Sequence, residues 1–64
     1  MYSIEIIDDL MCVMDQDGDG YDCHVLDTLV AALAQIDAWT GTYAFDIDDA
    51  RSQVNGFFSD RDQE

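Results

Sequence analysis

The sequence predicts an all-α fold, a small three-helix bundle formed by one acidic domain that spans residues 1–64. Two observations lead to this prediction. Apolar residues recur at spacings of three and four in three separate segments, which is the pattern of amphipathic helices. Short stretches rich in Asp, Gly and Thr separate these segments. Three amphipathic helices with short connections bury their apolar faces by packing as a bundle.

The first predicted helix covers residues 4–14. Ser3 is placed to cap it, and Glu5 lies in its first turn, where an acidic side chain is favourable. The stretch DQDGDG, residues 15–20, ends the helix because Asp and Gly favour turns. The residues of its apolar stripe are Ile4, Ile7, Leu10, Met11 and Met14.

The second predicted helix is the longest and ends near Trp39 and Gly41. Asp22 is placed to cap its beginning. Its expected buried face consists of Val25, Leu26, Leu29, Val30, Leu33 and Ile36.

The third predicted helix covers residues 47–58. Asp46 is its expected cap, and Asp48 and Asp49 lie at the positive end of the helix dipole. Its apolar face consists of Ile47, Ala50, Val54, Phe57 and Phe58. The remaining residues, 59–64, are expected to form a frayed and charged tail.

An α+β fold is the alternative. Tyr2, Ile4 and Ile6 occupy alternate positions in residues 2–7, and Tyr43, Phe45 and Ile47 do so in residues 42–47. Alternation of this kind also predicts strands, so the two segments would pair as a short two-stranded sheet beside the later helices.

The charge balance is the most extreme feature of the composition. The chain has fifteen acidic residues, two arginines and no lysine, for a formal net charge of −13. At 48% hydrophobic residues it is nevertheless too apolar for a disordered acidic tail. A surface of this charge avoids nucleic acid and anionic membranes, and it is attracted to basic protein surfaces. The fifteen carboxylates match the charge of about 25 Å of duplex DNA.

The stretch DQDGDG resembles the first half of an EF-hand calcium loop. Asp15, Asp17 and Asp19 occupy ligand positions one, three and five, and Gly20 occupies the position of the invariant glycine. The closing bidentate Glu is missing, because Leu26 stands at position twelve. A divalent-cation-binding domain with a degenerate loop and weak Ca²⁺ affinity is therefore an alternative function, although we expect no cofactor.

The cysteines and the candidate catalytic groups give no positive indication of function. The first ten residues predict neither a secretion signal nor a membrane span, so we expect a cytoplasmic protein with Cys12 and Cys23 as reduced thiols. A disulfide between them across the turn is the alternative. Together with His24 they lack the paired spacing of structural zinc sites. With one His and no Lys, the chain also lacks a nucleophile with its base, so we expect no enzyme.

In length, acidity and lack of lysine, the chain resembles the small phage-encoded DNA-mimic inhibitors, which include anti-CRISPR proteins. The resemblance implies an inhibitor that acts in the host cytoplasm and occupies the basic DNA-binding groove of a CRISPR effector complex. We expect a monomer rather than a homodimer. An acidic, salt-adapted interaction domain is a further alternative. The expected contacts with the partner are Glu5, Asp8, Asp9, Asp15, Asp17, Asp19, Asp22, Asp46, Asp48, Asp49, Asp60 and Asp62.

Overall fold

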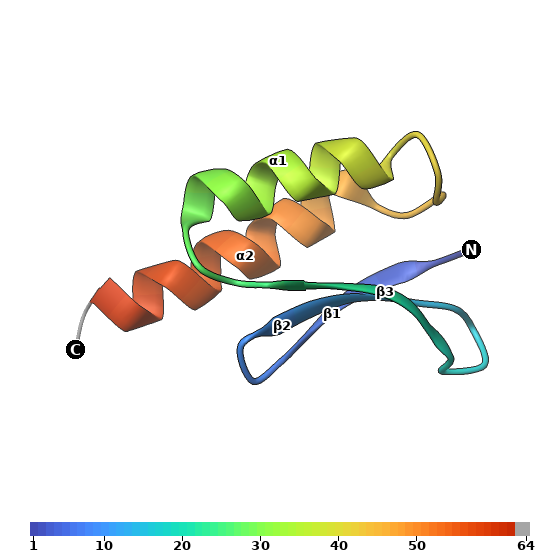
Figure 1. Ribbon diagram of the computed structural model, residues 1–64, viewed down its shortest axis with the longest axis horizontal. Helices are drawn as coiled ribbons and strands as arrows, with labels where there is room; N and C mark the ends of the chain where they lie inside the picture. The colour runs from blue at the N-terminus through green and yellow to red at the C-terminus, as the bar shows by residue number, and fades with distance from the viewer. Residues whose placement is uncertain (63–64) are drawn as a thin grey trace.

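A computed structural model describes residues 1–62 and contains a three-stranded antiparallel sheet with two helices (Figure 1). Strands β1 (Ser3–Ile7), β2 (Leu10–Met14) and β3 (Gly20–Val25) lie side by side in chain order. Helices α1 (Leu29–Trp39) and α2 (Ile47–Asp62) follow and cover one face of the sheet. The fold is therefore α+β, and the prediction of an all-α, three-helix bundle is wrong.

The segment predicted as the first helix is a β-hairpin. Ile4 pairs with Val13 and Ile6 with Met11, and all four side chains face the helices. The helical stripe instead included Ile7 and Leu10, which are 52% and 40% exposed. Both periods fit a short apolar run, but Ile and Val restrict χ1 in a helix and pack well on a pleated surface. Alternation with period two was the correct reading here.

The hairpin turn consists of Asp8 and Asp9. Ile7 and Leu10 are paired directly, so only two residues connect β1 to β2. Asp8 has φ of 56°, a left-handed conformation that Gly, Asn and Asp adopt more readily than other residues. Two adjacent aspartates thus provide a turn in the middle of the predicted helix.

The second predicted helix divides into a strand and a shorter helix. Residues 20–25 form β3, and α1 begins at Leu29 behind Thr28, whose Oγ1 accepts the Ala31 N–H at 3.1 Å. Thr28 is therefore the cap, and the assignment of that role to Asp22 is wrong. The predicted end near Trp39 is confirmed.

The third predicted helix is present and longer than expected. Asp46 caps it as predicted, since its Oδ1 accepts the Asp49 N–H at 3.1 Å. The helix continues past Phe58 to Asp62, so the tail predicted to fray is helical up to that residue. Residues 63–64 of that tail lie outside the described part of the chain.

The alternative fold was correct for one of its two strands. Residues 3–7 form β1, but residues 43–46 form no strand. A single backbone hydrogen bond of 2.8 Å, from the Tyr2 N–H to the Ala44 carbonyl, connects the two segments. The partner of β1 is instead β2, the nearest segment along the chain.

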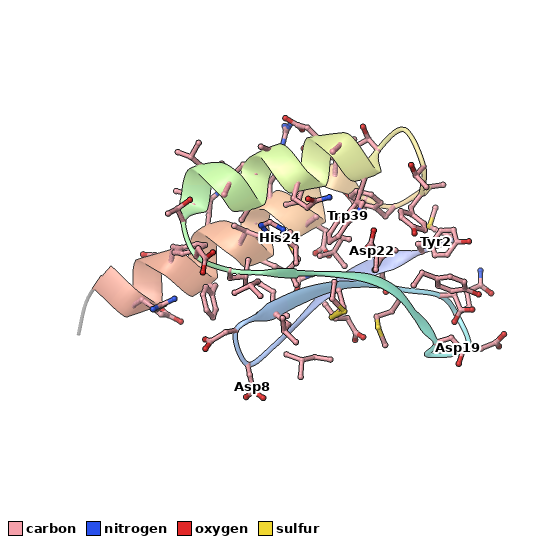
Figure 2. The ribbon with its side chains drawn as sticks, in the orientation of Figure 1. Tyr2, Asp8, Asp19, Asp22, His24 and Trp39 are labelled. Carbon is pink, nitrogen blue, oxygen red and sulfur yellow. A yellow bond between two sulfur atoms is a disulfide. The ribbon has the colours of Figure 1, made fainter. Side chains whose placement is uncertain are left out.

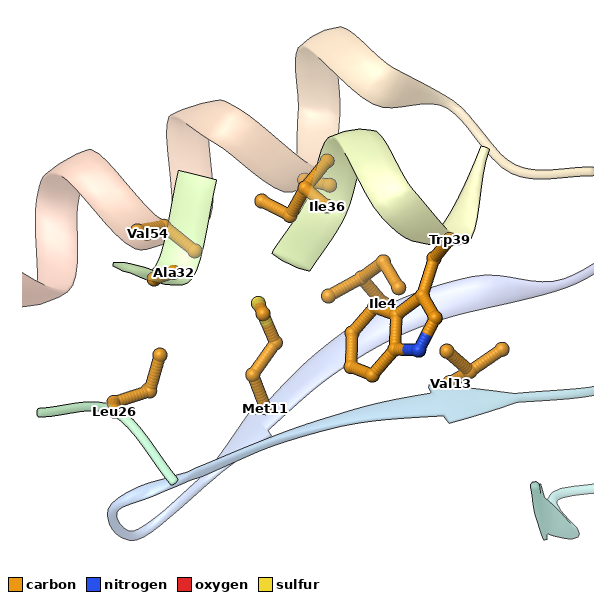
Figure 3. Packing of buried hydrophobic residues seen from close by; sticks show 9 residues of the cluster. Ile4, Met11, Val13, Leu26, Ala32, Ile36, Trp39 and Val54 are labelled. Atoms are coloured by element: carbon orange, nitrogen blue, oxygen red, sulfur yellow. The ribbon is translucent and has the colours of Figure 1, made fainter. Parts of the chain in front are cut away.

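The core lies between the sheet and the two helices (Figure 3). In addition, the Gln53 amide of α2 donates a 2.8 Å hydrogen bond to the Ile4 carbonyl, which holds α2 against β1. Neither described helix is both long and apolar enough to cross a membrane. The core residues are Ile4, Met11, Val13, Leu26, Ala32, Ile36, Trp39, Ala50 and Val54.

Cys12 and Cys23 form a disulfide on the face of the sheet opposite the helices. They are register partners in β2 and β3, with Cα atoms 4.2 Å apart. The expectation of two reduced thiols is therefore wrong for this structure. That expectation followed from the expected cytoplasmic location, whereas the antiparallel pairing of β2 with β3 sets the two cysteines directly opposite each other.

Candidate interaction surface

The turn between β2 and β3 is organised around the carboxylate of Asp15. Its Oδ1 accepts the backbone N–H groups of Asp17 and Asp19, each at 2.9 Å, and its Oδ2 accepts the Tyr21 hydroxyl at 3.0 Å. Gly18 has φ of 89°, a conformation that favours glycine. Asp15 therefore acts as the internal acceptor that closes the turn, although the sequence suggested a contact for a partner.

These hydrogen bonds shift two pKa values. The Asp19 N–H is the main cause that lowers the pKa of Asp15 below its ordinary value of 3.8. The Tyr21 hydroxyl and the Asp17 N–H add to this effect. In turn, the pKa of Tyr21 is raised above 10.0, first by its hydrogen bond to Asp15 and then by the negative charge of that carboxylate.

Asp17 and Asp19 differ from Asp15 because their carboxylates are exposed and accept none of these turn hydrogen bonds. Asp17 lines a shallow hollow of about 240 Å³ together with Met1, Tyr2, Asp15, Gln16 and Tyr21. The Tyr2 ring packs edge-on against Tyr21, with centroids 5.4 Å apart. This end of the sheet thus combines free carboxylates with aromatic rings.

The EF-hand-like reading of the turn meets two structural obstacles. Leu26, at the position of the closing Glu, is 2% exposed and belongs to the core. Within residues 1–62, no group of three His, Cys, Asp or Glu side chains converges as a metal site. His24 lies on the helix side of β3, opposite the face that carries Cys23 (Figure 2).

Asp22 connects the sheet to α1. Its Oδ2 accepts the Trp39 Nε1–H at 3.0 Å, and its Oδ1 accepts the Cys23 N–H at 3.0 Å. Figure 2 shows Asp22 and Trp39 facing each other between β3 and α1. Like Asp15, this predicted contact residue has a structural role.

The remaining predicted contacts lie on the surface in separate groups. Asp8 and Asp9 form the hairpin turn, and Glu5 lies on the uncovered face of β1. Asp46, Asp48 and Asp49 surround the first turn of α2, with Asp46 occupied as the cap. Asp60 and Asp62 belong to the last turn of α2, and Asp60 is exposed.

The structure does not gather these acids on a single face. The turns at Asp8 and at Asp15–Asp19 lie at opposite ends of β2, which at its five residues is about 14 Å long. The two ends of α2 carry the other groups. The carboxylates thus form several separate groups on the surface of the molecule.

Within residues 1–62, the predicted contacts omit two acids, and the roles of both arginines were also missed. Asp27 is exposed just after β3, beside the hairpin turn. Asp37 of α1 forms an ion pair of 2.7 Å with Arg51 of α2. Arg61 lies over the Phe57 ring, with 5.5 Å between Cζ and the ring centroid. The i, i+4 spacing of Phe57 and Arg61 was a visible signal, but no spacing in the sequence indicates the pair between helices.

No protein-family model matches the chain, and no curated protein or solved structure shows significant similarity to it.

Proposed function

We propose that the protein is an acidic inhibitor that occupies the basic DNA-binding groove of a partner, such as a CRISPR effector complex. The observation that carries the proposal is the uncompensated charge. The net charge is −13, and both arginines already contact groups within the chain, Asp37 and the Phe57 ring. A partner therefore meets carboxylates with almost no opposing positive charge.

The dimensions of the molecule support this proposal. Its longest extent is 34 Å, which is about one helical turn of B-DNA. Duplex DNA of that length carries about 20 phosphate charges, at one per 1.7 Å. A net charge of −13 over 34 Å is of the same order, so a groove that attracts DNA also attracts this protein.

The structure divides the predicted contacts into two classes. Asp15, Asp22 and Asp46 accept hydrogen bonds that hold the fold together, so they contribute charge but are not free to reorient. The carboxylates that we propose as direct contacts are those of Glu5, Asp8, Asp9, Asp17, Asp19, Asp48, Asp49 and Asp60, which belong to exposed residues. Of these, Asp49 also accepts a 3.0 Å hydrogen bond from the Gln53 amide of the same helix. Asp62 remains a proposed contact as the last residue of α2.

The cellular setting follows from the proposal. A CRISPR effector complex works in the host cytoplasm, where disulfides are reduced, so the proposal requires that the fold persist with the Cys12–Cys23 bond reduced. The protein would act there as a monomer, because two chains that each carry −13 repel one another. It would not bind nucleic acid or anionic membranes, and it needs no cofactor or catalytic group for this function.

A competition experiment tests the proposal. A CRISPR effector complex is mixed with labelled target duplex and increasing amounts of the protein, at about 50 mM and about 200 mM salt. We expect loss of DNA binding, with weaker inhibition at the higher salt because the contacts are electrostatic. Absence of inhibition at both salt concentrations across effector complexes of several types would refute the proposal.

Paired substitutions then locate the contacts. We compare Asp17→Asn/Asp19→Asn, Asp8→Asn/Asp9→Asn and Asp48→Asn/Asp49→Asn, each of which removes two exposed charges. Gln16→Ala, in the same turn as Asp17, is the uncharged control. A pair that lies at the interface should weaken inhibition, whereas uniform small effects from all three pairs would indicate attraction by net charge without a defined contact set.

A further inference from the structure

The face of the sheet that the helices leave uncovered carries an exposed apolar row. Ile7, Leu10 and Val25 are register partners across β1, β2 and β3, so their side chains lie side by side on this face. They are 52%, 40% and 51% exposed. We call these three residues the open apolar row. A contiguous exposed apolar surface on a small protein marks an interaction site more often than isolated apolar residues do.

The apolar surface continues along the strands. The next cross-strand row contains Glu5, Cys12 and Cys23, and the disulfide occupies its centre. Within the described residues, Glu5 is the only charged strand residue on this face, since Asp22 points toward the helices. Arg51 and Arg61 belong to α2, on the other side of the sheet.

Carboxylates border one end of the open apolar row. Asp8 and Asp9 connect Ile7 to Leu10, and the Leu26 N–H donates a 2.8 Å hydrogen bond to the Asp9 carbonyl. That bond holds the chain after β3 against the hairpin turn, which brings exposed Asp27 to the same end. Figure 2 shows Asp8 at the tip of the turn, directed away from the helices.

We infer that this uncovered face is a docking surface for a basic protein surface with an apolar centre. The inference rests on the proposed function for the basic character of the partner, and it adds an apolar contact surface to the proposed carboxylate contacts. The open apolar row packs against apolar groups and the aliphatic stems of Lys or Arg, while Glu5, Asp8, Asp9 and Asp27 pair with their charged ends.

Charge complementarity selects this occupant over a second copy of the chain. Two copies joined through this face would bring together two molecules of net charge −13, with Glu5 and the carboxylates of both hairpin turns close to one another. Like charges at an interface oppose association strongly. A basic partner removes that repulsion and buries the same apolar side chains.

The test uses two synthetic peptides of equal length and equal positive charge, one of alternating Leu and Lys and one of alternating Ser and Lys. Both attract the acidic protein, but only the first offers apolar side chains. At about 150 mM salt, where distant charges are screened, we expect the Leu–Lys peptide to bind at least about tenfold more tightly. Equal affinities would overturn the inference.

A variant of the face provides the matched comparison. Ile7→Thr/Leu10→Thr/Val25→Thr removes apolar surface and retains residues that favour strands. Val30→Thr, on α1, is the control, since Val30 is 78% exposed outside this face. The triple variant should lose the preference for the Leu–Lys peptide and the control should keep it. If the triple variant proves unstable, methyl NMR of the wild type with added Leu–Lys peptide replaces it. Changes in the methyl chemical shifts of Val30 but not of Ile7, Leu10 and Val25 would overturn the inference.

Two further outcomes separate this inference from the proposed function. If the protein fails to displace DNA from effector complexes but retains the peptide preference through this face, the proposed function is wrong and the docking surface stands. If the triple variant inhibits DNA binding as well as the wild type does, the docking surface is wrong and the inhibitor proposal stands. A dimer detected by sedimentation and abolished by the triple variant would show a second copy as the occupant and overturn the inference.

Discussion

The Nε1–H of Trp39 donates a hydrogen bond of 3.0 Å to Oδ2 of Asp22, and this contact connects α1 to β3. Trp39 is 4% exposed, so its indole N–H depends on a protein acceptor. Asp22 is at the same time one of the fifteen acids that define the character of the chain. One carboxylate thus contributes both to the negative surface and to the packing of the helices on the sheet.

Asp22→Ala should therefore destabilise the protein. The substitution leaves the Trp39 indole N–H without its acceptor, and we expect a loss of about 1–2 kcal/mol in the free energy of unfolding. Asp22→Asn keeps an acceptor oxygen and should cost less. Urea denaturation measures both, with Asp27→Ala as a control that removes an exposed acid of the same charge. Equal stability of the Asp22→Ala and Asp27→Ala variants would contradict the structural role.

Reduction of the Cys12–Cys23 disulfide should lower stability without unfolding the protein. The disulfide closes a loop with a sequence separation of 11 and lies on the uncovered face, while the core cluster lies on the other side of the sheet. A loop of this length contributes about 2–3 kcal/mol. Thermal unfolding with and without dithiothreitol, beside a Cys12→Ser/Cys23→Ser variant, measures the effect. Complete unfolding upon reduction would exclude a function in a reducing cytoplasm.

The charge of Asp15 should stabilise the turn between β2 and β3 in a pH-dependent way. Its pKa is lowered in the folded state, chiefly by the Asp19 N–H, so its contribution is present above the unfolded value of 3.8 and is lost as pH falls through the folded value. The melting temperature of Asp15→Asn should be lower than that of the wild type at pH 7, and the gap should close below pH 3.8. Asp17→Asn is the control, because its carboxylate does not close the turn. A gap that stays constant with pH would contradict this assignment.

Asp8 should tolerate glycine but not a β-branched residue. Its φ of 56° is accessible to Gly without strain, whereas Val at this position is disfavoured by about 1–2 kcal/mol. We expect Asp8→Gly to be neutral or stabilising and Asp8→Val to lower the melting temperature clearly. Asp9, the only other turn residue, lacks a positive φ and provides the control Asp9→Val. Similar melting temperatures for the two Val variants would show that the turn conformation is wrong.

Calcium should have little effect on stability. Asp15 already accepts two backbone N–H groups and the Tyr21 hydroxyl, which occupy about three of its four acceptor sites. Leu26, which is buried in the core, stands where the closing Glu of a calcium loop would be. We expect millimolar Ca²⁺ and Mg²⁺ to raise the melting temperature by the same small amount, through general screening of the negative charge. A selective increase with Ca²⁺ that disappears in the Asp17→Asn/Asp19→Asn variant would instead support the divalent-cation alternative.

The local sequence was sufficient to predict features that depend only on neighbouring residues. Asp46 caps α2 because a side chain at that position reaches a backbone N–H three residues later, and the spacing is visible in the chain. Trp39 ends α1 near Gly41, and DQDGDG forms a turn, since Gly and Asp favour such conformations. The net charge of −13, from which the proposed function derives, is likewise a property of the composition.

The strands, the disulfide and the orientation of Asp22 depend on contacts between segments that are separated along the chain. The apolar residues of 4–14 fit both a helical and an alternating period. The segment forms strands because β3, which begins six positions after the end of β2, provides hydrogen bonds along the second edge of β2. That pairing also set Cys12 opposite Cys23 and turned Asp22 toward Trp39. A strand receives its hydrogen bonds from other segments, whereas a helix supplies its own, so no local pattern could reveal which aspartates stay free for a partner.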